Sequence, residues 1–118
     1  MPALLSVCAL ACSYPALAPI AHDVTVTTLP PPPSCEHIAS IRGRAGTGWP
    51  PAETFPEPSS YTDRPLLLGY AMNDLRNRAA AVGANYVHRS EPTLSAPWGS
   101  ITIAEYAGFA YRCPLHRG

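Results

Sequence analysis

The chain has 118 residues, and its eight arginines balance eight acidic residues in the absence of lysine, so the formal net charge at pH 7 is zero. A chain of this length forms at most one domain, and it lacks the basic surface with which nucleic-acid-binding proteins neutralise phosphates. Fifteen prolines exclude an all-helical chain and mark the linkers and loops.

The first eleven residues, MPALLSVCALA, form an apolar run that ends at Cys12. This run is too short for a permanent transmembrane helix, which takes about 20 apolar residues, and it fits the apolar region of a secretory signal peptide. A cysteine after small residues, as in ALAC, is typical of bacterial lipoproteins. We therefore expect residues 1–21 to comprise a signal peptide with its lipidation motif and a short tether, and Cys12 to bind membrane lipid.

Three alternatives remain at this end of the chain. Cys8, in LSVC, is a second candidate for lipidation, although Val7 lies where a small residue is preferred. Cleavage by an ordinary signal peptidase after ALA would leave a soluble periplasmic protein, and the segment would otherwise be a buried strand or helix. Ser13 fits sorting to the outer membrane, so the expected location is the periplasmic face of that membrane.

Cys35 and Cys113 are the other two cysteines. Export would bring them into an oxidising compartment, in which disulfides persist. A bond between them would close a loop of about 80 residues, to which the chain-entropy model assigns on the order of 4 kcal/mol. This pairing follows if Cys8 and Cys12 leave with the leader or are modified there. The alternative is two free thiols.

Two strands are predicted before the helix. Residues 22–29, HDVTVTTL, alternate polar and β-branched side chains, and PPPPS ends this pattern. Residues 35–43 form the second predicted strand, which ends at Gly43 and has one face made of Cys35, His37, Ala39 and Ile41. Apolar residues recur at no regular spacing in residues 44–62, which predicts a long loop.

A helix follows, with Thr62 or Asp63 as its cap and Pro65 in its first turn. Gly83 is predicted to terminate it. Apolar residues recur every three or four positions and predict that the helix buries the face formed by Leu68, Met72, Leu75, Ala79 and Val82.

The remaining residues predict strands again. ANYVHR, residues 84–89, is one strand, and residues 92–99 read as a turn or loop. Residues 100–113 form one long strand or two halves around Gly108. The order β-β-α-β-β predicts an α+β domain over residues 22–118, in which one helix packs on one face of a small, mostly antiparallel sheet. Cys35 and Cys113 would then lie on neighbouring strands or across one end of the sheet.

No catalytic pattern is visible, because the acidic residues are scattered and no serine lies in a nucleophile motif. We therefore expect no enzymatic activity and no cofactor. His37 and His88, both on predicted strands, are weak candidates for metal ligands. A zinc site needs three or four converging ligands, and no closely spaced histidine pair supplies them.

Aromatic residues fall into two groups. Tyr86, Tyr106, Phe109 and Tyr111 belong to predicted strands, where they indicate cross-strand packing. Loop aromatics are candidates for contact with a partner protein, because tryptophan and tyrosine are enriched at binding hot spots; we name Trp49, Phe55 and Trp98. Alternatively, the long loop folds back over the open face of the sheet.

Four features follow one another along the chain: a leader cysteine, the pattern C-x-x-I-x-x-I-x-G, the segment MNDLRNRAAAVGANYV and the sequence AYRCP. In these features the chain resembles small bacterial lipoproteins grouped as domain of unknown function 4156, and more distantly the RcsF envelope-stress lipoprotein. RcsF-like proteins carry four cysteines in the folded domain, whereas this chain has Cys35 and Cys113, which leaves one structural disulfide. Its GAN turn is similar in style to that of the YbjQ-like family, sometimes called heavy-metal-binding, whose β-β-α-β-β units assemble into rings.

The resemblance, together with the leader, implies a non-enzymatic envelope lipoprotein domain. Such a domain would serve as a structural, sensing or protein-interaction module and would contact an envelope protein. The alternative is a soluble or ring-forming periplasmic module that binds metal.

Overall fold

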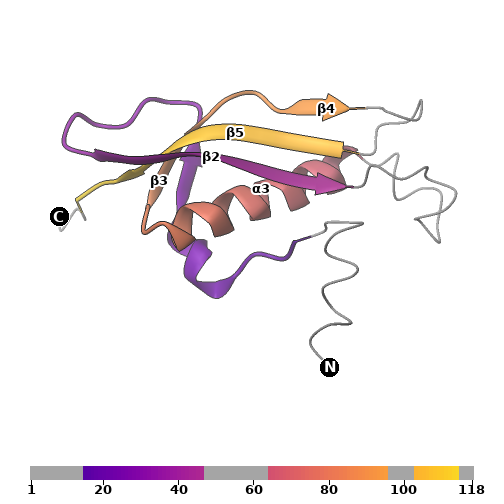
Figure 1. Cartoon of the computed structure of the whole chain (residues 1–118), viewed down its shortest axis with the longest axis horizontal. Helices are drawn as coiled ribbons and strands as arrows, with labels where there is room; N and C mark the ends of the chain where they lie inside the picture. The colour runs from indigo at the N-terminus through magenta and orange to yellow at the C-terminus, as the bar shows by residue number, and fades with distance from the viewer. Residues whose placement is uncertain (1–14, 47–63, 96–102, 115–118) are drawn as a thin grey trace, which may run out of the picture.

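The computed structural model describes residues 15–46, 64–95 and 103–114. It is an α+β fold with an open, mostly antiparallel sheet and one α-helix packed against it, as predicted (Figure 1). The elements are η1 (Pro19–Asp23), β1 (Thr25–Thr27), β2 (Glu36–Gly46), α3 (Arg64–Ala81), β3 (Tyr86–Arg89), β4 (Thr93–Ser95) and β5 (Ile103–Arg112), where η1 is a short 3-10 helix.

The sheet is built around β5, which pairs along its whole length with β2. β3 and β4 share the other edge of β5, β3 along its second half and β4 along its first residues. These three pairings are antiparallel, whereas the short strand β1 pairs with β3 in parallel. The order across the sheet is therefore β1-β3-β5-β2, with β4 beside β5.

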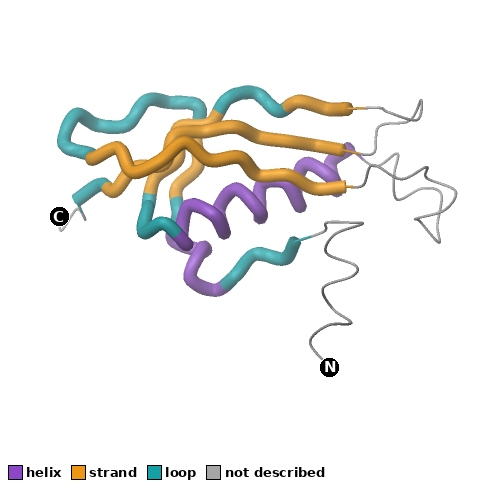
Figure 2. Tube along the Cα trace, in the orientation of Figure 1, coloured by secondary structure: helices purple, strands orange, loops and turns teal. Residues whose placement is uncertain are grey.

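Two crossing connections lie on opposite sides of this sheet. β2 and β3 run in the same direction because both are antiparallel to β5, and α3 connects them on one face. The connection from β1 to β2 arches over the other side (Figures 1 and 2). One face of the sheet is therefore covered by a helix, and the other, which we call the open face, is not.

The hydrophobic core lies between α3 and the sheet. α3 buries residues four positions apart, and these are Leu67, Ala71, Leu75 and Ala79. The predicted buried face was correct for Leu75 and Ala79, but Leu68 and Met72 lie at the margin of the core and Val82 is 43% exposed. The difference arises because the stripe of residues four positions apart faces the sheet, and Leu68 and Met72 lie one position beyond it.

The C-terminus of α3 is as predicted. Gly83 has a φ of 82°, the left-handed conformation that favours glycine. The Gly83 N–H donates to the Ala80 carbonyl at 3.0 Å, and the Ala84 N–H donates to the Ala79 carbonyl at 2.9 Å. This pair of bonds is the Schellman motif, which satisfies the last carbonyls of a helix.

Gly43 allows α3 to lie directly against β2. A Cβ atom at this position would lie 2.4 Å from the Leu75 backbone nitrogen and 2.5 Å from the Ala71 carbonyl oxygen. Beside this contact the Arg44 N–H donates to Asp74 Oδ2 at 2.8 Å, and Arg78 Nε donates to the same oxygen at 2.9 Å. Asp74 thus pairs with a backbone amide of an edge strand, a group that otherwise invites association with other chains.

β2 differs from its prediction in two ways. It continues past Gly43 to Gly46, because Gly43 serves close packing and not a turn. A bulge between His37 and Ala39 shifts the register, so the predicted alternation through Cys35, His37, Ala39 and Ile41 was wrong. His37 lies opposite Tyr111, and Ser40 lies opposite Phe109, which places both on the open face.

Other strands also differ in extent. β1 has only three residues, and His22 and Asp23, predicted as strand, belong to η1. Residues 93–95, predicted as part of a turn or loop, form β4, because they continue the pairing of β3 along β5. β5 is one continuous strand through Gly108.

The segment before β1 is bound to the helix, although we expected a tether through residue 21. Asn77 accepts a hydrogen bond from the Ala18 N–H at 2.8 Å and donates to the Ala16 carbonyl at 2.8 Å. Asn73 donates to the Pro15 carbonyl at 3.1 Å, and Ala21 is completely buried. The folded unit therefore includes residues 15–21.

The helix–strand contact predicts opposite effects for two glycine-to-alanine substitutions. Gly43→Ala should lower the free energy of unfolding by about 1–3 kcal/mol or more, because the new methyl group meets helix backbone that cannot move alone. Gly69→Ala, whose Cβ would meet nothing within 4 Å, should raise it by about 0.5–1 kcal/mol, since glycine disfavours a helix interior. Urea denaturation measures both, and equal effects would contradict the close contact.

Candidate functional site

Five ring-bearing side chains gather on the open face, and we call them the open-face cluster. Strand register places Tyr111 of β5 between His37 of β2 and Tyr86 of β3, and Phe109 of β5 beside His88 of β3. Side chains directly opposite each other in a sheet share a face. The open-face cluster therefore consists of His37, Tyr86, His88, Phe109 and Tyr111.

The rings contact one another edge to face or at a tilt. His37 lies 5.4 Å from Tyr111 and 5.9 Å from Phe109, measured between ring centroids. Tyr86 lies 6.4 Å from Tyr111. Aromatic rings favour these distances and angles because the positive edge of one ring meets the negative face of another. Phe109 is nevertheless 50% exposed, so this packing leaves a large apolar ring in contact with solvent.

The cluster confirms the predicted cross-strand packing for three of four strand aromatics. Tyr106 is the exception, because it points to the helix side of β5 and is only 7% exposed. There the Arg89 guanidinium lies 5.2 Å from its ring centroid, a cation–π contact. An open depression of about 1000 Å³ is lined by Phe109 and His88, by Arg42, and by Arg78, Ala81 and Val82 at the C-terminal end of α3.

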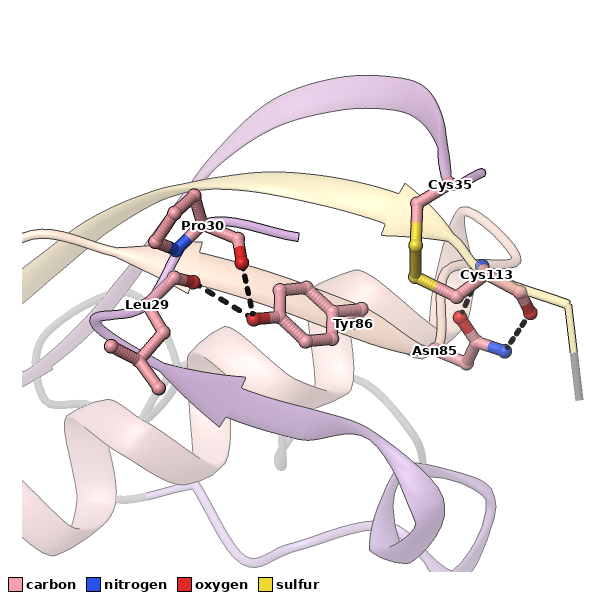
Figure 3. Close-up of a disulfide and its surroundings, with 6 residues drawn as sticks. All are labelled: Leu29, Pro30, Cys35, Asn85, Tyr86 and Cys113. Atoms are coloured by element: carbon pink, nitrogen blue, oxygen red, sulfur yellow. Dashed lines mark hydrogen bonds between the residues drawn. A yellow bond between two sulfur atoms is a disulfide. The ribbon is translucent and has the colours of Figure 1, made fainter. Parts of the chain in front are cut away.

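Residues 28–34, which we call the proline loop, are held by the cluster at their first end (Figure 3). The Tyr86 hydroxyl lies 2.8 Å from the Leu29 carbonyl oxygen and 3.2 Å from that of Pro30, and it donates to them. His88 Nε2 lies 3.1 Å from the Thr28 carbonyl oxygen. Leu29 itself is 67% exposed. The proline loop therefore borders the cluster and leaves Phe109 uncovered.

A disulfide holds the second end of the proline loop, and it is the predicted one. Cys35 and Cys113 are bonded, with Cα atoms 4.1 Å apart, at the adjoining ends of β2 and β5 (Figure 3). Asn85 binds the backbone of Cys113, because its side chain accepts from the Cys113 N–H at 2.7 Å and donates to the Cys113 carbonyl at 2.8 Å. Three strands are thus joined at one end of the sheet.

The two candidate metal ligands lie on the same face without a third. His37 and His88 belong to β2 and β3, and β5 lies between them. Within residues 15–46, 64–95 and 103–114, no group of three or more histidine, cysteine, aspartate or glutamate side chains lies close enough to hold a metal ion. His37 instead packs against aromatic rings, and His88 faces a backbone carbonyl.

Several predicted functional residues lie outside the described residues, and these are Cys8, Cys12, Trp49, Phe55 and Trp98. The open-face cluster itself was not predicted as a site. The alternating positions of Phe109 with Tyr111 and of Tyr86 with His88 indicated shared faces, but His37 joins them only after the bulge in β2. No helix in the described part of the chain is long and apolar enough to cross a membrane.

The disulfide is expected to raise the free energy of unfolding. The double variant Cys35→Ser/Cys113→Ser should lose on the order of 4 kcal/mol in free energy of unfolding, because the bond joins residues 78 apart in the chain. Reduction of the unaltered protein should give the same loss in guanidinium denaturation, and reductant should not affect the variant further. An unchanged denaturation midpoint in both cases would contradict a stabilising bond.

Comparison with known proteins places the chain in a family without assigning an activity. Neither the curated proteins nor the solved structures contain a match to it. One family model matches, described as a domain of unknown function, DUF4156, over residues 16–113. The match begins at the segment bound by Asn73 and Asn77 and ends at the disulfide, so it covers the whole folded unit. The chain belongs to the DUF4156 family.

Proposed function

We propose that this protein is a non-enzymatic lipoprotein domain of the bacterial envelope that contacts another envelope protein through the open-face cluster. Lipid at Cys12 anchors it at the periplasmic face of the outer membrane. The observation that carries the proposal is the half-exposed ring of Phe109, which packs against His37 on a face without a covering helix, where His37 also contacts Tyr111.

Exposed aromatic rings on a rigid support suit protein recognition. Aromatic side chains supply large contact areas and lose little conformational entropy on binding, and they are enriched at binding hot spots. Here the rings belong to paired strands, and the disulfide and Asn85 hold the adjoining strand ends. The loop residues Trp49, Phe55 and Trp98 remain predicted contributors to the same contact.

The disulfide and the leader support an envelope location. Disulfides persist in oxidising compartments such as the periplasm and are rare in the reducing cytosol. The apolar leader that ends in ALAC is the motif expected for export and for lipid attachment at Cys12. More than one acyl chain gives stable anchoring, and a lipoprotein N-terminus supplies this.

Anchoring is tested with two matched cysteine variants. Cys12→Ser should abolish incorporation of a radiolabelled or clickable fatty acid, because the acylated thiol is gone, whereas Cys8→Ser should leave incorporation unchanged. Intact mass of the membrane-bound protein should correspond to a lipid-modified chain that begins at Cys12. Equal labelling of Cys12→Ser and the unaltered protein would overturn this anchor.

Contact with a protein is tested by photo-crosslinking in intact cells. A photoreactive phenylalanine analogue at position 109 should form a discrete adduct with an envelope protein, whereas the same analogue at position 66, in the first turn of α3, should not. Leu66 is a suitable control because its exposure of 42% is close to the 50% of Phe109, and it lies outside the residues that line the depression beside Phe109. Adducts at both positions in similar yield, or at neither, would contradict the proposed surface.

A further inference from the structure

We propose that the outer side of α3 lies on the lipid surface, so that the open-face cluster points away from the membrane. This inference rests on the proposed lipid at Cys12. The juxtaposition that carries it is the binding of Pro15, Ala16 and Ala18 to Asn73 and Asn77, which begins three positions after Cys12.

The bound segment shortens the link between lipid and domain. A fully extended chain spans at most about 3.6 Å per residue, so the Cα atoms of Cys12 and Pro15 can be separated by at most about 11 Å. If the segment were released as far as the buried Ala21, the same limit would be about 32 Å. Asn73 and Asn77 therefore decide whether the domain stays at the membrane or moves freely above it.

The shorter distance is comparable to the thickness of the lipid headgroups. Subtracting the hydrocarbon core from the whole bilayer leaves roughly 5–8 Å of headgroup region on each side. A lipid-modified Cys12 lies in this region, so Pro15 and its partner Asn73 must lie in it or directly above it. Confinement of this kind gives the adjacent protein surface a high effective concentration at the membrane.

The surface next to Pro15 suits a lipid interface. Residues at spacings of three and four form the outer side of α3, opposite the buried face, and these are Leu66, Gly69, Asn73 and Asn77, the last two partly covered by residues 15–18. None of them carries a charge that anionic lipids would repel. Leu66 is 42% exposed, and Ile20, in the bound segment, is 73% exposed. Apolar side chains at this level gain from partial insertion among the headgroups.

This orientation decides what the domain presents to the periplasm. The N-terminal segment and α3 lie on one side of the sheet, and the connection from β1 to β2 lies on the other (Figure 1). Phe109 belongs to the open face, so it points away from a membrane that contacts the outer side of α3. The partner would then reach the open-face cluster from the periplasm and not from within the bilayer.

The test measures which side of the lipidated protein is close to lipid. A fluorescent amino acid replaces either Gly69, where a Cβ atom would meet nothing within 4 Å, or the half-exposed Phe109. The full lipidated chain is reconstituted in vesicles of phosphatidylethanolamine and phosphatidylglycerol that carry headgroup nitroxides. We expect several-fold stronger quenching at position 69 than at position 109.

The binding of residues 15–18 to α3 is tested with the variant Asn73→Ala/Asn77→Ala, which lacks the side chains that hold this segment. Quenching at positions 69 and 109 should become similar in this variant, because the tether is longer. Thr93→Ala, a control at the exposed first residue of β4, should keep the difference. If the double variant kept the full difference in quenching between positions 69 and 109, the binding of residues 15–18 to Asn73 and Asn77 would not orient the domain.

Failure of the orientation can be distinguished from failure of the anchor. Intact mass is measured on each reconstituted sample. A lipidated chain with equal quenching at positions 69 and 109, or with stronger quenching at position 109, would overturn the orientation and leave the anchor standing. A chain without lipid at Cys12 would overturn both.

Discussion

The direct contact between α3 and β2 at Gly43 determines most of this structure. Because Gly43 lacks a side chain, the backbone around Ala71 and Leu75 lies against the strand, and Asp74 comes within hydrogen-bonding distance of the Arg44 amide. This contact assigns α3 to one face of the sheet. It also turns Asn73 and Asn77 outward, where they bind the N-terminal segment. The aromatic cluster lies on the open face, which α3 does not cover, so the two faces of the sheet have different surroundings.

The open-face cluster depends on a second set of contacts, which lie at one end of the sheet. The disulfide and Asn85 join the ends of β2, β5 and the turn before β3, which fixes the relative positions of His37, Tyr111 and Tyr86. Tyr86 in turn holds the first end of the proline loop, and Cys35 terminates its second end. A rigid, half-exposed aromatic surface of this kind loses little entropy when a partner binds, which is why we place the contact there.

In the proposed arrangement, α3 connects the lipid anchor at Cys12 with the open-face cluster. The segment that would follow a lipidated Cys12 binds the outer side of α3, and the cluster lies on the opposite face of the sheet. A domain held in this way would present one surface to the periplasm continuously. Two asparagine side chains and one glycine determine this arrangement, because Asn73 and Asn77 bind the N-terminal segment and Gly43 brings α3 against the sheet.

The sequence by itself determined the fold class, the C-terminus of α3 at Gly83, the cysteine pairing and the family resemblance, because apolar periodicity, glycine and cysteine act through local or pairwise chemistry. Its errors arose where distant segments meet. The bulge at His37 changed which β2 residues share a face, Gly43 proved to be a packing position within β2, and the expected tether proved to be bound to Asn73 and Asn77. Only the tertiary structure decided these points, because strand register and helix–strand distance depend on side chains far apart in the chain.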